Sequence, residues 1–92
     1  KKDEGRALNL FEQACKQDLV AGCWRLGRRL LKRPTREKEG EQLLESACAE
    51  GQPNACFDVA ERLKQRNTKN TQIRPYLLRA CTGGVKEACK RL

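Results

Sequence analysis

Six cysteines recur at regular intervals along this chain, and their spacing constrains the fold more than any other feature. They form three C-x7-C pairs, and each pair follows the previous one by 33 residues. The positions are Cys15, Cys23, Cys48, Cys56, Cys81 and Cys89. An even number of regularly spaced cysteines in a short chain indicates a disulfide framework and an oxidising compartment.

Two other uses of the cysteines stay open at this level, namely free buried thiols and a bound metal. The metal alternative fits poorly because the 92 residues include no histidine and no C-x2-C pair, which structural zinc sites normally use. Each C-x7-C pair would also supply only two of the four ligands of a tetrahedral site. We therefore expect no metal and no other cofactor.

The composition leaves little apolar surface to hold such a chain together. With 92 residues, 38% hydrophobic and 35% charged, the chain allows one small domain or a short array. Little apolar area is then available to offset the entropy lost on folding. Covalent cross-links are an obvious supplement.

Residues other than cysteine follow the same period, which divides a single array, 1–92, into units 1–33, 34–66 and 67–92. Matching positions include Ala14 with Ala47 and Ala80, Phe11 with Leu44 and Leu77, Trp24 with Phe57, Leu26 with Val59, and Leu30 with Leu63. Agreement at so many positions indicates an internal repeat. We expect Trp24 and Phe57 to pack between units.

Each unit has the pattern of two helices. Apolar residues at i, i+3, i+4, i+7 and i+8 predict an amphipathic first helix in unit one; they are Ala7, Leu10, Phe11, Ala14 and Cys15. A break follows at Asp18, Gly51 and Gly84, where glycine suits the left-handed residue after a helix. Pro53 fits the first turn of a second helix. Alternating strand patterns are absent, so we expect an all-α fold.

Local signals predict where the first helices of the later units begin. Thr35, and either Asn70 or Thr71, are expected to cap them. Pro75 is expected to delay the start of the third such helix until about Arg74.

The cysteines occupy corresponding places in each predicted hairpin: the last turn of the first helix and the first turns of the second. A tight antiparallel hairpin can bring such positions within about 5–6 Å between Cα atoms, which a disulfide allows. The loops are short, so each bridge would contribute only about 2.5 kcal/mol in the entropic model.

The segments around the cysteine pairs resemble one repeat family. Residues 14–23, 47–56 and 80–89 each begin with Ala-Cys and end with a small residue before the second cysteine, and Trp24-Arg25-Leu26-Gly27 follows in unit one. In these features the chain is similar to Sel-one-like repeats, specifically the disulfide-bridged variety of bacterial cysteine-rich (Hcp-type) proteins. The resemblance covers all three units, although the glycine-rich loop usual between units is missing.

This resemblance implies a right-handed α-α superhelix, tetratricopeptide-like, of three hairpins with one disulfide each: Cys15–Cys23, Cys48–Cys56 and Cys81–Cys89. Such solenoids bind proteins or peptides on an extended curved surface. The concave side would be lined by the first helices. The candidate contact residues on that side are Arg6, Asn9, Gln13, Gln42 and Arg79.

A series of basic residues suggests the nature of a partner. They follow i, i+3, i+4, i+7 and i+11 spacing and are Arg25, Arg28, Arg29, Lys32 and Arg36. If the helix persists, the first four form a stripe opposite Leu26 and Leu30. This stripe is either a solvated face or a docking strip for an acidic protein surface, which the net charge of +8 favours. Nucleic acid is disfavoured because few aromatic residues are available for base stacking.

Catalytic groups are scarce. The chain has no histidine, and its only serine, Ser46, lies in neither S-x-x-K nor G-x-S-x-G. We therefore expect a non-catalytic protein-binding module, such as an adaptor, an assembly factor or an inhibitor. Family analogy offers a periplasmic immunity protein as a concrete example. The alternative that the resemblance implies is a weak hydrolase that binds β-lactams or peptidoglycan fragments.

The expected location is extracytoplasmic. The chain begins Lys1-Lys2-Asp3-Glu4, without an initiator methionine or an apolar leader, so we expect a mature or excised fragment. No stretch approaches 18 consecutive apolar residues, so we expect no membrane insertion. The periplasm or the exterior of the cell is expected, with the mitochondrial intermembrane space as an alternative. The oligomeric state is not indicated.

Overall fold

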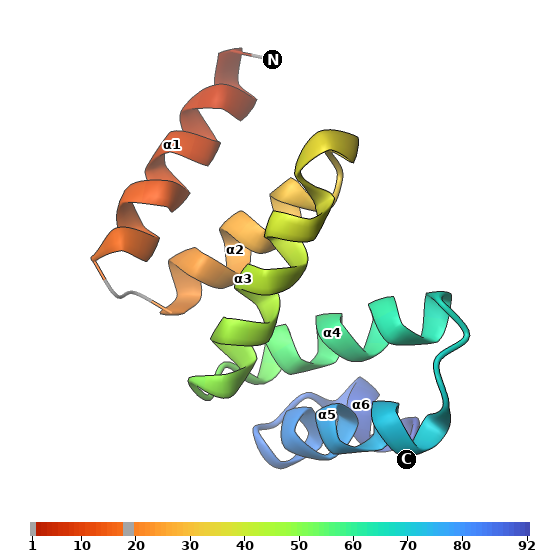
Figure 1. Ribbon diagram of the computed structural model, residues 1–92. Helices are drawn as coiled ribbons and strands as arrows, with labels where there is room; N and C mark the ends of the chain where they lie inside the picture. The colour runs from red at the N-terminus through yellow and green to blue at the C-terminus, as the bar shows by residue number, and fades with distance from the viewer. Residues whose placement is uncertain (1, 18–19) are drawn as a thin grey trace.

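The protein consists of consecutive helices joined by short turns. A computed structural model describes residues 2–17 and 20–92 (Figure 1). Its helices are α1 (Lys2–Lys16), α2 (Val20–Leu30), α3 (Glu37–Ala49), α4 (Pro53–Gln65), α5 (Asn70–Thr82) and α6 (Lys86–Lys90), and a 3-10 turn at Pro34–Arg36 precedes α3. No strand occurs within these residues, so the predicted all-α class is confirmed.

The helices form three successive pairs, α1–α2, α3–α4 and α5–α6, one in each predicted unit. Each helix packs chiefly against its neighbours along the chain. The pairs therefore follow one another from the N-terminal to the C-terminal end of a molecule that measures 39 × 25 × 18 Å (Figure 1).

Two apolar clusters hold the pairs together. The smaller one contains Leu8, Leu26 and Leu30 of the first unit, and Leu43 of the second unit packs against it. The larger one is built from residues of the second and third units, and Trp24 and Phe57 pack against it. Trp24 thus packs between units, as its repeat position predicts.

A close approach of two glycines fixes how α3 crosses α2. A Cβ atom on Gly40 would lie 2.7 Å from the carbonyl oxygen of Gly27, and one on Gly27 would lie 3.0 Å from Cγ of Leu44. Only a residue without a side chain allows backbones to approach so closely. Glycine at both positions therefore lets the second unit pack directly against α2.

The turns within the second and third pairs follow the predicted glycine pattern. Gly51 and Gly84 have φ values of 98° and 105°, in the left-handed region that glycine adopts without steric cost. The N–H of Gln52 donates to the carbonyl oxygen of Ala47 at 3.0 Å, the six-to-one bond of a Schellman motif. Asp18, the predicted break in the first pair, lies outside the described residues.

The predicted helix caps are wrong. Thr35 lies inside the 3-10 turn that Pro34 begins, so its backbone is already helical and cannot adopt a cap conformation. Arg36 precedes α3 and its side chain makes no capping hydrogen bond. In the third unit the extended residue before the helix is Lys69, and Asn70 is the first helical residue.

The predicted late start of α5 is also wrong, because the helix runs through Pro75. Proline removes one backbone donor, which would otherwise bond the carbonyl of Thr71. Both residues are exposed, so water can satisfy that carbonyl. Ile73 and Leu77 are buried on either side of the proline, and their packing outweighs the local penalty.

Each helix pair is closed by one disulfide. The bonds join Cys15 to Cys23, Cys48 to Cys56, and Cys81 to Cys89, with Cα–Cα distances of 4.5, 4.6 and 4.7 Å. These are the pairs predicted from the sequence. None of the six cysteines remains free, in agreement with the disulfide prediction.

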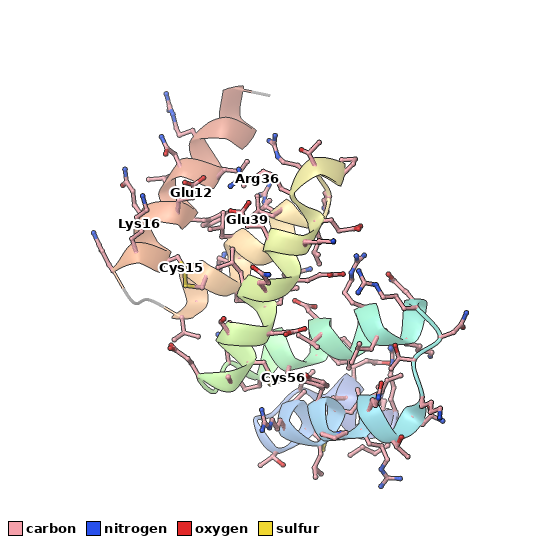
Figure 2. The ribbon with its side chains drawn as sticks, in the orientation of Figure 1. Glu12, Cys15, Lys16, Arg36, Glu39 and Cys56 are labelled. Atoms are coloured by element: carbon pink, nitrogen blue, oxygen red, sulfur yellow. A yellow bond between two sulfur atoms is a disulfide. The ribbon has the colours of Figure 1, made fainter. Side chains whose placement is uncertain are left out.

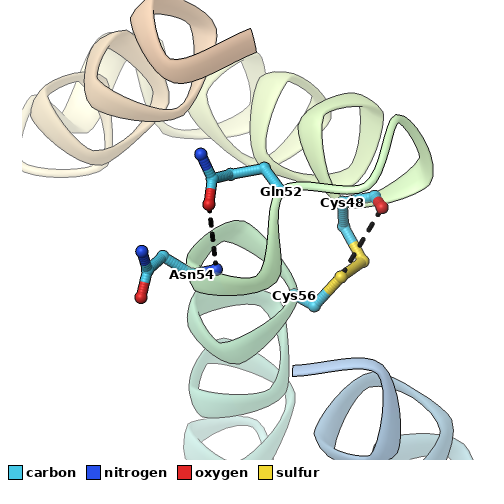
Figure 3. The surroundings of a disulfide bond; sticks show 4 residues. All are labelled: Cys48, Gln52, Asn54 and Cys56. Atoms are coloured by element: carbon cyan, nitrogen blue, oxygen red, sulfur yellow. Dashed lines mark hydrogen bonds between the residues drawn. A yellow bond between two sulfur atoms is a disulfide. The ribbon is translucent and has the colours of Figure 1, made fainter. Parts of the chain in front are cut away.

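The middle disulfide shows how a hairpin is organised (Figure 3). Gln52 precedes α4, and its side-chain oxygen accepts a 3.3 Å hydrogen bond from the N–H of Asn54. Sγ of Cys56 lies 3.6 Å from the carbonyl oxygen of Cys48. Because a bridged sulfur carries no hydrogen, this is a close sulfur–oxygen contact. Cap and bridge together fix the start of α4 against the end of α3.

Candidate functional site: a basic groove beside α1 and α2

The predicted basic stripe lines a surface hollow of about 350 Å³. Its lining residues are Phe11, Arg25, Arg28, Arg29 and Lys32, and we call this the basic groove. The four cations are exposed. They therefore lie on the same side of the molecule, as their spacing predicts.

The helix that carries these cations is shorter than the regular spacing of the basic residues predicts. Burial of Leu26 and Leu30 fixes the orientation of α2, but the helix ends at Leu30. Arg33 is extended, with φ −107° and ψ 113°, as expected for a residue before proline. Lys32 therefore reaches the groove from a turn, where its N–H donates to the carbonyl oxygen of Arg29.

Two aromatic rings organise the arginines. The guanidinium carbon of Arg29 lies 5.9 Å from the ring centroid of Phe11, which brings this α2 cation close to α1. Those of Arg25 and Arg28 lie 5.8 and 5.4 Å from the ring centroid of Trp24. Cations at such distances are attracted by the ring quadrupole, so the groove combines positive charge with aromatic surface.

A carboxylate of the next unit anchors one edge of the groove. The indole Nε1–H of Trp24 donates a 2.6 Å hydrogen bond to Oδ2 of Asp58. Nε of Arg28 lies 3.5 Å from the same oxygen. Burial raises the pKa of Asp58, although the bond from Trp24 and the charge of Arg28 act in the opposite direction.

Three other cations of the groove have no carboxylate partner among the side chains that the structure describes; they are Arg25, Arg29 and Lys32. Several arginines outside the groove are paired. The arginines paired with glutamates are Arg36, Arg62, Arg66 and Arg91. Arg6, Arg74 and Arg79 also lack a carboxylate partner among those side chains, so what distinguishes the groove is that its cations line one hollow.

Arg36, the fifth residue of the predicted series, is not part of the groove. Its guanidinium donates two hydrogen bonds to Glu39, at 3.1 and 3.0 Å (Figure 2). These bonds hold the pKa of Glu39 below its usual value. Glu12 of α1 adds a favourable Coulombic interaction with Arg36, so this arginine helps to join the first two units.

A second charged cluster was not anticipated from the sequence. Arg62 of α4 pairs with Glu37 at 3.1 Å and with Glu41 at 2.9 Å. Arg66 also donates to Glu41. The half-buried Glu41 thus receives two guanidinium groups and ties α3 to α4. Whether these arginine and glutamate side chains meet depends on the hairpin geometry, which no local sequence motif indicates.

The candidates for the concave face are surface residues, and their role as one binding face stays a prediction. Arg6, Asn9, Gln13, Gln42 and Arg79 are all exposed. No hydrogen bond or ion pair links them within the described residues. Arg79 lines a separate hollow of about 550 Å³, together with Leu78, Thr82 and Pro53.

Other chemistry has little support in the described parts of the chain. Ser46 is exposed on α3. No group of three or more cysteine and carboxylate side chains in those parts is placed to hold a metal. None of the helices there combines the length and the apolar character that crossing a membrane requires.

Comparisons with protein-family models, with curated proteins and with solved structures find no match to this chain.

Proposed function

We propose that this protein is an extracytoplasmic, non-catalytic binding module that captures an acidic protein partner in the basic groove. The observation that carries this proposal is the gathering of Arg25, Arg29 and Lys32, without carboxylate partners in the described chain, next to Phe11. The three disulfides indicate an oxidising compartment. The periplasm or the exterior of the cell is the more specific location that we propose.

The gathering of like charges favours binding over a merely solvated surface. Cations that line one hollow repel one another in the free protein, and carboxylates of a partner would relieve that repulsion. Arginine is suited to this role because its planar guanidinium can bind a carboxylate through two parallel hydrogen bonds. Phe11 supplies an apolar surface in the same hollow, where a partner side chain can be desolvated.

We further propose that the three pairs form a right-handed superhelix of the Sel-one-like type. The C-x7-C pair in each hairpin, the 33-residue period and the small residues at helix crossings support this assignment. An inhibitor of the immunity type, which covers an acidic effector, would use such a charged surface. This role rests on analogy with the repeat family.

The test is capture of a partner from an extracytoplasmic extract, followed by calorimetry with the purified partner. The groove variant is Arg25→Glu/Arg29→Glu/Lys32→Glu, which leaves the Arg28–Asp58 pair intact. The control, Lys38→Glu/Lys69→Glu/Lys86→Glu, makes the same change in net charge at exposed sites elsewhere.

Wild type and control should bind an acidic protein, with affinity that falls as salt is raised. The groove variant should lose most of that affinity. Equal binding by wild type and the groove variant would remove the groove from the proposal.

A further inference from the structure

Within the residues that the structure describes, α1 leaves open a face that its counterparts in the later units bury. Leu44 and Leu77 are 0% and 7% exposed, whereas Phe11, at the same repeat position, is only half-buried. Leu10 is 59% exposed, whereas its counterpart Leu43 is half-buried. The sequence pattern is the same in each unit, so the difference arises from what covers these positions.

In the second unit the covering element is the second helix of the unit before. Leu44 lies against Gly27 of α2, and Leu43 packs against the cluster that contains Leu26 and Leu30. Leu77 of α5 belongs to the same cluster as residues of α4. Within the described residues, α1 has no helix in the corresponding place, and Figure 1 shows it at one end of the molecule.

Charged contacts between successive units add a second constraint on what fits this face. Arg28 pairs with Asp58, and Glu61 pairs with Arg91. In both cases a residue on the second helix of one unit pairs with the residue 30 positions later in the next unit. Asp58 lies on α4, and Arg91 lies directly after α6. The two pairs therefore occupy the same repeat positions with opposite polarity.

Arg25 stands at the repeat position of Asp58 and Arg91, 33 residues before the first of them. It has no carboxylate partner among the side chains that the structure describes. By the rule that the other two pairs follow, a helix stacked before α2 would place a residue opposite Arg25. That residue must be acidic to complement it.

The helix α4 shows the full set of features that such an occupant needs. Ala60, at the repeat position of Gly27, is a small buried residue. Glu61 supplies the carboxylate for an arginine of the next unit. Val59 is buried and Leu63 is partly buried against the core. Through residues of this kind α4 packs against α5, and Glu61 reaches Arg91 just beyond α6.

We propose that the open face formed by Leu10, Phe11 and Arg25, the stacking face, binds an amphipathic helix of the acidic partner protein. The helix packs as α4 packs against the third unit, with a small residue at the crossing and a carboxylate opposite Arg25. This inference rests on the proposed function, because it specifies the form of the acidic partner. The stacking face shares Phe11 and Arg25 with the basic groove.

The experiment uses a labelled, side-chain-stapled helical peptide with the α4 sequence, in which Cys56 is replaced by alanine. Binding to the intact protein is followed by fluorescence anisotropy. Leu10→Asp should weaken binding at least about tenfold, because it places a charge in an apolar contact. Leu78→Asp is the matched control, since Leu78 is 57% exposed on α5, and it should leave the affinity unchanged.

A charge exchange tests the contact with Arg25. Arg25→Glu should weaken binding of the peptide, and the peptide carrying Glu61→Lys should restore it. Arg74→Glu, at an exposed site of α5, should have no effect with either peptide. Equal affinity of Leu10→Asp and wild type for the peptide, or no restoration by the exchange, overturns the proposal.

Two further outcomes separate this inference from the proposed function. If the captured partner is lost by Arg29→Glu/Lys32→Glu but bound normally by Leu10→Asp, the basic groove stands and the stacking face does not. If sedimentation shows a dimer of the protein that Leu10→Asp abolishes, the occupant is a second copy, and the proposal of a separate partner is overturned.

Discussion

The indole N–H of Trp24 donates a 2.6 Å hydrogen bond to the carboxylate of Asp58, 34 residues further along the chain. The bond joins the second helices of two successive units. The Asp58 side chain is 22% exposed, and burial is the largest influence on its pKa, which it raises. The contact that aligns two units therefore contains a carboxylate that is costly to ionise.

The stability of the fold should depend on pH through the titration of Asp58. Its pKa in the folded state lies above the ordinary value of 3.8, so the folded state holds this proton more tightly than the unfolded state. The resulting stabilisation is full below pH 3.8 and is lost as pH rises through the folded-state pKa. Asp58→Asn cannot titrate there, yet its amide oxygen can still accept from Trp24.

Urea unfolding of both proteins across this range measures the effect. The unfolding free energy of wild type minus that of Asp58→Asn should fall as the pH is raised from 3.8 towards neutrality. A difference that grows with pH would show that Arg28 and Trp24 outweigh burial.

The three disulfides should differ in their contribution to stability. Replacing Cys48 and Cys56 by alanine removes about 2.5 kcal/mol of loop entropy and opens space in the core, where both residues are buried. Replacing Cys81 and Cys89 should cost less, because Cys89 is exposed beside the last turn. Chemical denaturation gives both values, and the reverse order would contradict this account.

Mass spectrometry provides the control for the bridges themselves. The intact mass without reductant should be lower by six hydrogens than the mass after reduction. Equal masses would show that the bridges do not form.

Gly40→Ala should destabilise the protein although alanine is the better helix former. A Cβ atom there would lie 2.7 Å from the carbonyl oxygen of Gly27 and 3.0 Å from the N–H nitrogen of Leu31. Both are backbone atoms that cannot swing aside, so overpacking should outweigh the gain in helix propensity and leave a loss of about 1–2 kcal/mol.

Ser46→Ala, at an exposed position of the same helix, is the matched control for Gly40→Ala. It should be neutral or slightly stabilising. Thermal unfolding followed by circular dichroism compares the two, and an unchanged midpoint for Gly40→Ala would refute the close crossing of α2 and α3.

The purified protein should hydrolyse a chromogenic β-lactam no faster than buffer. The chain has no histidine, its cysteines are bridged, and Ser46 lies exposed on α3. A nucleophile with an adjacent base is therefore difficult to assemble. Turnover that survives repeated purification and disappears in Ser46→Ala would favour the enzymatic alternative instead.

The features predicted correctly from the sequence are those that depend on local spacing. The C-x7-C interval places Cys48 and Cys56 at facing ends of one predicted hairpin, within reach of a disulfide, and the resemblance to the repeat family implies their pairing. The i, i+3, i+4 spacing likewise places Arg25, Arg28 and Arg29 on one exposed face. By contrast, the course of α5 through Pro75 depends on tertiary packing, which local propensity does not report.

Contacts between units were the part that sequence reasoning missed. The pairing of Arg28 with Asp58 depends on how one hairpin stacks on the next, which no single unit specifies. Phe11 was predicted to lie on an apolar face of the first helix. It lines the groove because, within the described residues, no helix covers this part of α1. One signal was present, since Arg25, Asp58 and Arg91 share a repeat position with alternating charge.

The opposite polarity of the two inter-unit pairs also specifies the order of assembly. If the third unit stacked directly on the first, within one molecule or between two, Arg91 would face Arg28 and two positive charges would meet. Repeat proteins are prone to such misassembly because their units are alike, and like charges in contact disfavour the wrong pairing. The charged pairs between units thus favour the correct neighbouring unit over a wrong one. The shared apolar pattern alone would not distinguish the two.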